Sequence, residues 1–173
     1  TSFFTATSAT CVTGLIRVDT YSHWSWFGQF VIISLIQIGG IGFMTLCIYI
    51  LTLAKKKIGI ISRSIMQNSI SSPQVGGIVK ITKFIIGGTF IIEAIGAFLL
   101  SLVFCPRFGF LKGIWFSIFH SISAFCNAGF DLMGTIEPFN SLISYQDSWY
   151  VNLIIMSLIV IGDKIIKFTY QLS

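Results

Sequence analysis

Residues 27–54 carry no charged side chain, and this uninterrupted apolar run limits the chain to few kinds of fold. A helix needs about 20 apolar residues to cross the hydrocarbon core of a bilayer, so the run is long enough to span it with some tilt. Residues 84–104 form a second such run, interrupted only by Glu93 near its middle. Charged residues make up only 10% of the chain, against about 25% in soluble domains. The sequence therefore predicts an all-α integral membrane protein.

A short motif occurs twice, at residues 5–15 and 120–130, in register and without a gap. Four residues are identical in the two copies, pairing Ser8 with Ser123, Ala9 with Ala124, Cys11 with Cys126 and Gly14 with Gly129. Such a repeat means that one structural unit is used more than once. Residues 1–13 and 113–125 around it would each form a helix of about 20 Å, too short for a core of about 30 Å. Both segments are predicted to be re-entrant.

A re-entrant segment suits an ion pathway because it combines a short helix with extended chain. Non-helical backbone persists at membrane depth only where protein buries it or water lies beside it. Its carbonyl oxygens can replace the hydration shell of an alkali cation, and the carbonyl end of the helix favours positive charge. Gly14 and Gly129 stand at the predicted turns, where a side chain would block the path or forbid the backbone angles. The repeat therefore predicts two pore loops.

The chain has a net charge of +5, and its basic residues are concentrated in one stretch between the two apolar runs. Residues 55–83 contain no Asp or Glu and carry six basic side chains: Lys55, Lys56, Lys57, Arg63, Lys80 and Lys83. A basic loop between membrane spans faces the cytoplasm. Residues 105–148 are predicted to lie outside, since acidic side chains outnumber basic ones there. This placement predicts a lipid bilayer, and no nucleic acid, as the partner of the basic residues.

The sequence contains nothing that is typical of an enzyme. There is no H-E-x-x-H or G-x-S-x-G motif, and no acid/base pair at helical spacing. The four cysteines, Cys11, Cys47, Cys105 and Cys126, have no partner at C-x-x-C spacing, so neither zinc nor a disulfide framework is predicted. His120 is interpreted as a residue that packs against or caps its short helix. We expect a protein without catalytic residues or cofactors.

Three segments carry a resemblance to a known family. They are residues 10–15 (TCVTGL), residues 37–43 (QIGGIGF) and residues 119–130 (FHSISAFCNAGF). At these residues the chain resembles the Trk/Ktr/HKT superfamily of potassium-transporting membrane proteins, most closely the Ktr-type membrane subunit of bacteria. The resemblance implies four repeated helix–re-entrant pore loop–helix units around one cation pore, of which this chain holds a part. It also implies a bacterial plasma membrane location with several passes.

The resemblance further implies what the two loops do. Gly14 and Gly129 would be two of four filter glycines, while Val12, Thr13, Asn127 and Ala128 would supply neighbouring carbonyls to K⁺. The implied activity is potassium uptake, with Na⁺ as a possible stimulator. The implied partners are a second copy of the protein and a cytosolic nucleotide-binding regulatory subunit.

The two repeats divide the chain as follows. Residues 1–54 would be the end of repeat one, with its pore loop at 1–15 and a spanning helix at 27–54. Residues 55–83 would be the cytoplasmic loop. Residues 84–162 would be repeat two, with a spanning helix at 84–104, a pore loop at 113–130 and the start of its second helix at 149–162. Residues 163–173 are predicted to be an atypical tail, because Asp163 and Lys164 follow Gly162 where the family repeats its Gly-Gly-x-Gly-Phe motif.

Two polar residues inside the predicted spans leave alternatives open. Glu93 is either part of a functional site or an interhelical hydrogen-bond partner, because an intramembrane carboxylate is costly unless it faces protein or water. Gln37 either bonds to a neighbouring helix or faces a wet cavity. For the chain as a whole, the alternative to a potassium pathway is a structural or assembly subunit whose short segments are merely buried helices.

Overall fold

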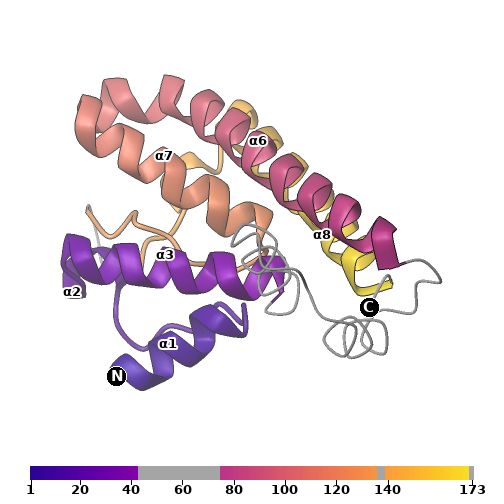
Figure 1. Ribbon diagram of the computed structural model, residues 1–173. Coiled ribbons are helices and arrows are strands. Elements are labelled where there is room, and N and C mark those ends of the chain that lie inside the picture. The colour runs from indigo at the N-terminus through magenta and orange to yellow at the C-terminus, as the bar shows by residue number, and fades with distance from the viewer. Residues whose placement is uncertain (43–74, 136–138, 172–173) are drawn as a thin grey trace.

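The computed structural model describes residues 1–42, 75–135 and 139–171 (Figure 1). Every regular element in these ranges is helical. In chain order they are α1 (Ser2–Thr10), α2 (Thr20–His23), α3 (Trp26–Ile41), α6 (Val75–Phe108), α7 (Phe110–Phe125), the 3-10 helix η1 (Ile143–Tyr145) and α8 (Trp149–Gln171). The prediction of an all-α fold is confirmed for the described residues.

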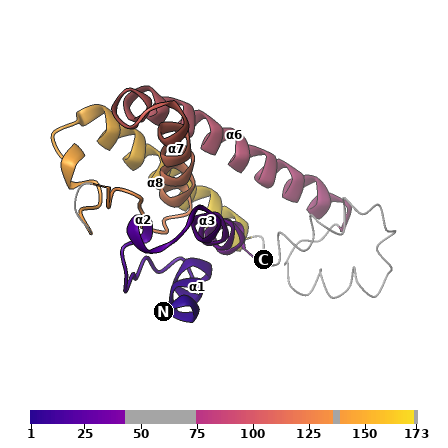
Figure 2. The ribbon, with the colours of Figure 1, turned by 90° about the vertical axis from the view of Figure 1, so that its left-hand side faces the viewer.

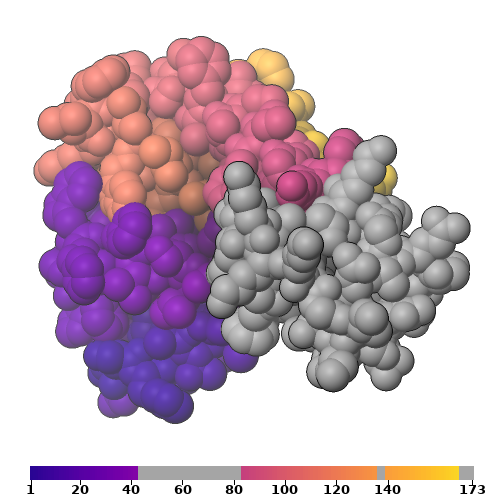
Figure 3. Space-filling model, viewed as in Figure 1, coloured from indigo at the N-terminus to yellow at the C-terminus, as the bar shows by residue number. Residues whose placement is uncertain are grey.

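The helices pack around α7, which lies between the two halves of the chain. The long helix α6 ends at Phe108, and the chain reverses through Gly109, whose φ of +85° suits glycine, into α7. Helix α8 contacts both α6 and α7, and α3 contacts α7 from the other side. Helix α1 packs against α3 at the edge of the molecule, as two perpendicular views show (Figures 1 and 2). The space-filling view shows the same order, with α1 and α3 below α7 and α6 (Figure 3).

Helix α6 buries polar residues near its middle and exposes a stripe of large apolar ones. Thr89 and Glu93 are buried against the other helices. The opposite stripe is exposed and consists of Phe84, Ile91, Ile95, Phe98 and Leu102. Water would disfavour this distribution, whereas lipid favours it, because intramembrane polar side chains turn toward protein. Residues Lys83–Phe108 and Trp149–Lys167 are each long and apolar enough to cross a membrane.

The structure corrects the predicted boundaries around the basic loop. Helix α3 begins at Trp26, where the Ser25 hydroxyl accepts a hydrogen bond from the Gly28 N–H at 3.3 Å, and this agrees with a span starting near residue 27. Helix α3 ends at Ile41, before Gly42 with its φ of +86°, so the predicted continuous helix at 27–54 is interrupted there. Residues 43–74, which hold the rest of the predicted span and most of the basic loop, lie outside the described residues. Helix α6 starts at Val75, so residues 75–83 of the predicted loop are helical, and their cytoplasmic location stays a prediction.

The last helix also differs from its prediction. Residues 149–162 are predicted as the start of the second helix and residues 163–173 as an atypical tail, but α8 continues without a break through Asp163 and Lys164 to Gln171. Asp163 forms an ion pair at 2.8 Å with Lys167 one turn later, which adds modest support to this part of the helix. The predicted tail at 163–173 is therefore helical as far as residue 171. Whether its sequence is atypical for the family stays a prediction.

Candidate functional site

The two repeated motifs end their helices with the same hydrogen bonds. After α1, the Val12 N–H donates to Ala9 O at 3.2 Å and the Thr13 N–H to Ser8 O at 3.0 Å. After α7, the matching bonds run from Asn127 to Ala124 at 3.1 Å and from Ala128 to Ser123 at 2.8 Å. This pair of bonds is the Schellman motif, which satisfies carbonyls at a helix end. The sequence repeat is therefore a structural repeat of two short helices followed by non-helical chain.

The residues after each helix adopt matching left-handed conformations. The φ angle is 53° at Val12 and 57° at Asn127, and it is 72° at both Gly14 and Gly129. Asparagine and glycine tolerate positive φ, but a β-branched residue such as Val12 adopts it only at a cost of about 1–3 kcal/mol. Strain of this kind persists where the surroundings hold it, often at functional sites. We refer to residues 11–15 as loop one and residues 126–130 as loop two.

Loop one and loop two meet at their glycines. A Cβ atom added to Gly14 would lie 2.6 Å from the carbonyl oxygen of Ala128, so only glycine fits there. A Cβ on Gly129 would lie 3.7 Å from the Cα of Gly14, and nothing else stands within 4 Å of it. Thr13, Asn127 and Gly129 are exposed, whereas Ala128 is buried. The structure thus brings Gly14 against Ala128 and Gly129, while Val12, Thr13 and Asn127 belong to the same two loops. The role of these six predicted residues in ion binding stays a prediction.

Glycines of the following helices let the loops sit close to the helix backbones. A side chain on Gly39 of α3 would overlap the carbonyl of Thr10, the last residue of α1. In the same way, a side chain on Gly162 of α8 would overlap the carbonyl of Phe125, the last residue of α7. Gly39 and Gly162 therefore have the same packing role in the two repeats. This role of Gly162 was not predicted from the sequence, although Gly162 occupies the position where the family repeats its Gly-Gly-x-Gly-Phe motif.

Gly40 connects the two repeats. A side chain there would overlap Cys126 of loop two, whose exposed fraction is only 1%. Cys11, which matches Cys126 in loop one, is exposed. The helix of repeat one therefore covers the loop of repeat two, and in the described residues nothing covers loop one in the same way. Cys11, Cys105 and Cys126 are all free thiols.

Gln37 and Glu93 form a polar contact between α3 and α6. The Gln37 Nε2 atom donates to both carboxylate oxygens of Glu93, at 2.9 and 3.0 Å. The Ser121 hydroxyl of α7 donates to the main-chain oxygen of Glu93 at 2.7 Å, and Glu93 itself is 4% exposed. The Sγ atom of Cys126 lies 4.0 Å from Gln37 Oε1, so this contact stands directly behind loop two. Of the two readings given for each residue, the structure supports the interhelical hydrogen bond.

A double-mutant cycle tests this contact. We expect Glu93→Leu to lower the stability of the detergent-solubilised protein by about 1–3 kcal/mol, because it leaves the Gln37 amide buried without its acceptor. Adding Gln37→Leu should recover most of that loss, since removing both partners removes the unsatisfied group. Thermal unfolding of the two single variants and the double variant measures the coupling. Additive effects of the two substitutions would contradict it.

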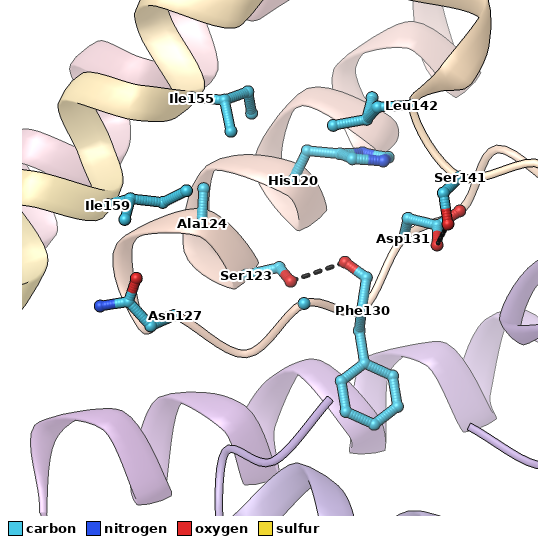
Figure 4. Close-up of a pocket in the computed structure, with 11 residues that line it drawn as sticks. His120, Ser123, Ala124, Asn127, Phe130, Asp131, Ser141, Leu142, Ile155 and Ile159 are labelled. Carbon is cyan, nitrogen blue, oxygen red and sulfur yellow. Dashed lines mark hydrogen bonds between the residues drawn. The ribbon is translucent and has the colours of Figure 1, made fainter. Parts of the chain in front are cut away.

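A cavity of about 260 Å³ lies behind loop two, between α7 and α8 (Figure 4). Its polar wall is formed by His120, Ser123, Asn127, Asp131 and Ser141, and Ile155 and Ile159 of α8 form the apolar wall. The carboxylate of Asp131 accepts hydrogen bonds from the Met133 N–H and the Ser141 hydroxyl, both at 3.0 Å. These bonds connect the residues directly after loop two with the chain before η1. The sequence had no periodic signal for this cavity, because its walls come from segments far apart.

Known proteins are similar to this chain over nearly all of its length. The sequence matches the family described as TrkH, cation transport protein, over residues 1–170. Over 161 residues it is 45% identical to the potassium/sodium uptake protein NtpJ of Enterococcus hirae and 43% identical to Ktr system potassium uptake protein B of Bacillus subtilis. Each alignment covers 93% of this chain and 35% of the relative, so the chain spans about a third of the length of these curated relatives. The chain belongs to the TrkH family of cation transport proteins.

Proposed function

We propose that loop one and loop two line part of a pathway that admits potassium across a bacterial plasma membrane. The observation that carries the proposal is the meeting of two repeat-equivalent glycines, Gly14 and Gly129, at the ends of two short helices with identical end geometry. The relatives are named as potassium or potassium/sodium uptake proteins, which supports the same class of ion.

The proposed chemistry uses backbone atoms. The carbonyls of Val12, Thr13 and Gly14, together with those of Asn127, Ala128 and Gly129, would replace water around a dehydrated K⁺. Helices α1 and α7 both end at these loops, and the carbonyl end of a helix carries a partial negative charge. No catalytic side chain is needed, because selectivity of this kind comes from the number and placement of carbonyl oxygens.

The rest of the pathway would come from other parts of the assembly. Two loops enclose only part of a pore, so we propose two further repeats of the same kind around it. The basic stretch at 55–83 would face the cytoplasm. A second copy of the protein and a cytosolic nucleotide-binding subunit would complete the complex, and Na⁺ would stimulate the uptake of K⁺.

Ion uptake by the protein as its gene encodes it tests the proposal. We expect cells that lack their own potassium uptake to accumulate Rb⁺ in preference to Na⁺ when they express it with its regulatory subunit. Empty-vector cells are the control. If the protein is abundant and correctly inserted but moves no Rb⁺, the proposal is wrong, and the alternative of a structural or assembly subunit gains the weight.

A further inference from the structure

Loop one and loop two start alike, but the chain that follows them is held differently. In α7, the Ser123 hydroxyl donates to the carbonyl of Phe130 at 2.6 Å, directly after Gly129 (Figure 4). In α1, the matching Ser8 hydroxyl shares a hydrogen bond of 2.9 Å with the hydroxyl of Thr13, before Gly14. One serine thus fixes the chain beyond its glycine, and the other does not.

His120 makes a second connection to the chain beyond Gly129. Its Nδ1 atom lies 2.7 Å from the carbonyl of Phe116, which can only accept, so Nδ1 carries the proton. Nε2 is then free to accept a hydrogen bond from the Leu132 N–H at 3.4 Å. The ring is 3% exposed and packs edge-on against Phe104 at 5.5 Å between centroids. These contacts fix the neutral imidazole in one orientation.

The repeat-equivalent position in α1 has no such connection. Thr5 matches His120, and its buried hydroxyl lacks a hydrogen-bond partner among the described residues. In that same part of the structure, no side chain of α1 bonds to the residues that follow Gly14. Loop two therefore has two side-chain attachments on the far side of its glycine, and loop one has none.

These attachments matter because residues 130–135, which follow Gly129, belong to no helix or strand. Their backbone groups must find partners elsewhere, since buried N–H and C=O groups are costly when unpaired. The Phe130 carbonyl accepts its hydrogen bond from Ser123, and the Leu132 N–H donates to His120, so both groups are paired with side chains of α7. The two buried side chains of α7 therefore limit where the backbone at Gly129 can lie.

We propose that Ser123 and His120 are positioning residues that hold the carbonyls of loop two in place and so determine how well the pathway separates K⁺ from Na⁺. The inference rests on the proposed function, because it assigns these residues to the same pathway. Carbonyls that are free to move inward can fit a smaller ion, whereas carbonyls held at a fixed separation favour the larger one.

The test measures the ratio of Rb⁺ to Na⁺ uptake in the protein as its gene encodes it, normalised to the amount in the membrane. We expect Ser123→Ala to lower the ratio about three- to tenfold, the effect of one net hydrogen bond. Ser117→Ala is the control and should leave the ratio within about twofold, because its hydroxyl donates within α7, to the Gly113 carbonyl at 2.7 Å, rather than to the chain after Gly129. His120→Phe should lower the ratio, while His120→Gln, which keeps an acceptor for the Leu132 N–H, should preserve most of it.

The outcomes separate the inference from the proposed function. Selective uptake by the unaltered protein that Ser123→Ala and His120→Phe both retain would overturn the inference alone. An unaltered protein without selective uptake would overturn the proposed function and this inference with it. A second readout is independent of transport: in detergent, amide hydrogen exchange at residues 128–134 should be faster in Ser123→Ala than in Ser117→Ala, and equal rates would count against the inference.

Discussion

Replacing Gly129 by serine or aspartate is expected to abolish selective uptake while the protein still folds. A Cβ at this position meets only the Cα of Gly14, at 3.7 Å, so the new side chain has room within the described structure. It would nevertheless occupy the exposed side of loop two and strain a residue whose φ is +72°, at a cost of about 1–2 kcal/mol. A loss of about 1.4 kcal/mol in stabilising the dehydrated ion slows its passage about tenfold. Rb⁺ and Na⁺ uptake measures the effect.

Gly109→Ser is the matched control for this prediction. Gly109 also has a positive φ, +85°, and nothing lies within 4 Å of its missing Cβ, but it lies in the turn between α6 and α7. It should therefore show the cost of backbone strain without the loss of uptake. Gly14→Ser should differ from both, because its Cβ would lie 2.6 Å from the Ala128 carbonyl and would also separate the loops. Normal uptake and ion preference in Gly129→Asp would contradict the predicted role of the glycine.

Replacing Gly40 by leucine is expected to destabilise the protein strongly. Even the first carbon of the side chain would overlap Cys126, so α3 and loop two must separate. Overfilling a packed interior costs about 1–3 kcal/mol, and here both the Sγ and the Cβ atoms of Cys126 would be overlapped. We expect a lower melting temperature in detergent and a smaller monodisperse fraction in gel filtration.

Gly87→Leu provides the comparison, since Gly87 also lies in a long membrane helix and has nothing within 4 Å of its missing Cβ. It should leave the melting temperature almost unchanged. A milder pair tests the contact directly: Cys126→Gly should suppress the defect of Gly40→Ala, because it removes both atoms that the new methyl group would meet. Equal destabilisation by Gly40→Leu and Gly87→Leu would contradict the prediction that close packing of α3 against loop two requires glycine at position 40.

Several features of this fold could be predicted from the sequence because they depend on local pattern. The run without charge after residue 26 indicates a membrane helix, and α3 begins there. The repeated serine, alanine, cysteine and glycine predict two equal helix ends, and the φ angles and hydrogen bonds of loop one and loop two match closely. The helical state of residues 163–171, which are predicted only as an atypical tail, could not be predicted from apolar pattern, because the apolar run ends at Gly162 while α8 continues to Gln171.

From the amino-acid sequence alone, the chain could be predicted to be a helical membrane protein with a repeated short helix and a glycine after each copy. Charge content, apolar length and repetition are properties of the chain, and they hold however the helices pack. Three contacts could not be predicted from such properties and are seen in the folded structure: Gly14 lies against Gly129, Gly40 packs against Cys126, and Glu93 accepts a hydrogen bond from Gln37. The different hydrogen-bond partners of Ser8 and Ser123, Thr13 and Phe130, also could not be predicted. Such contacts join residues far apart in the chain, and two identical residue types differ in role because packing gives them different neighbours.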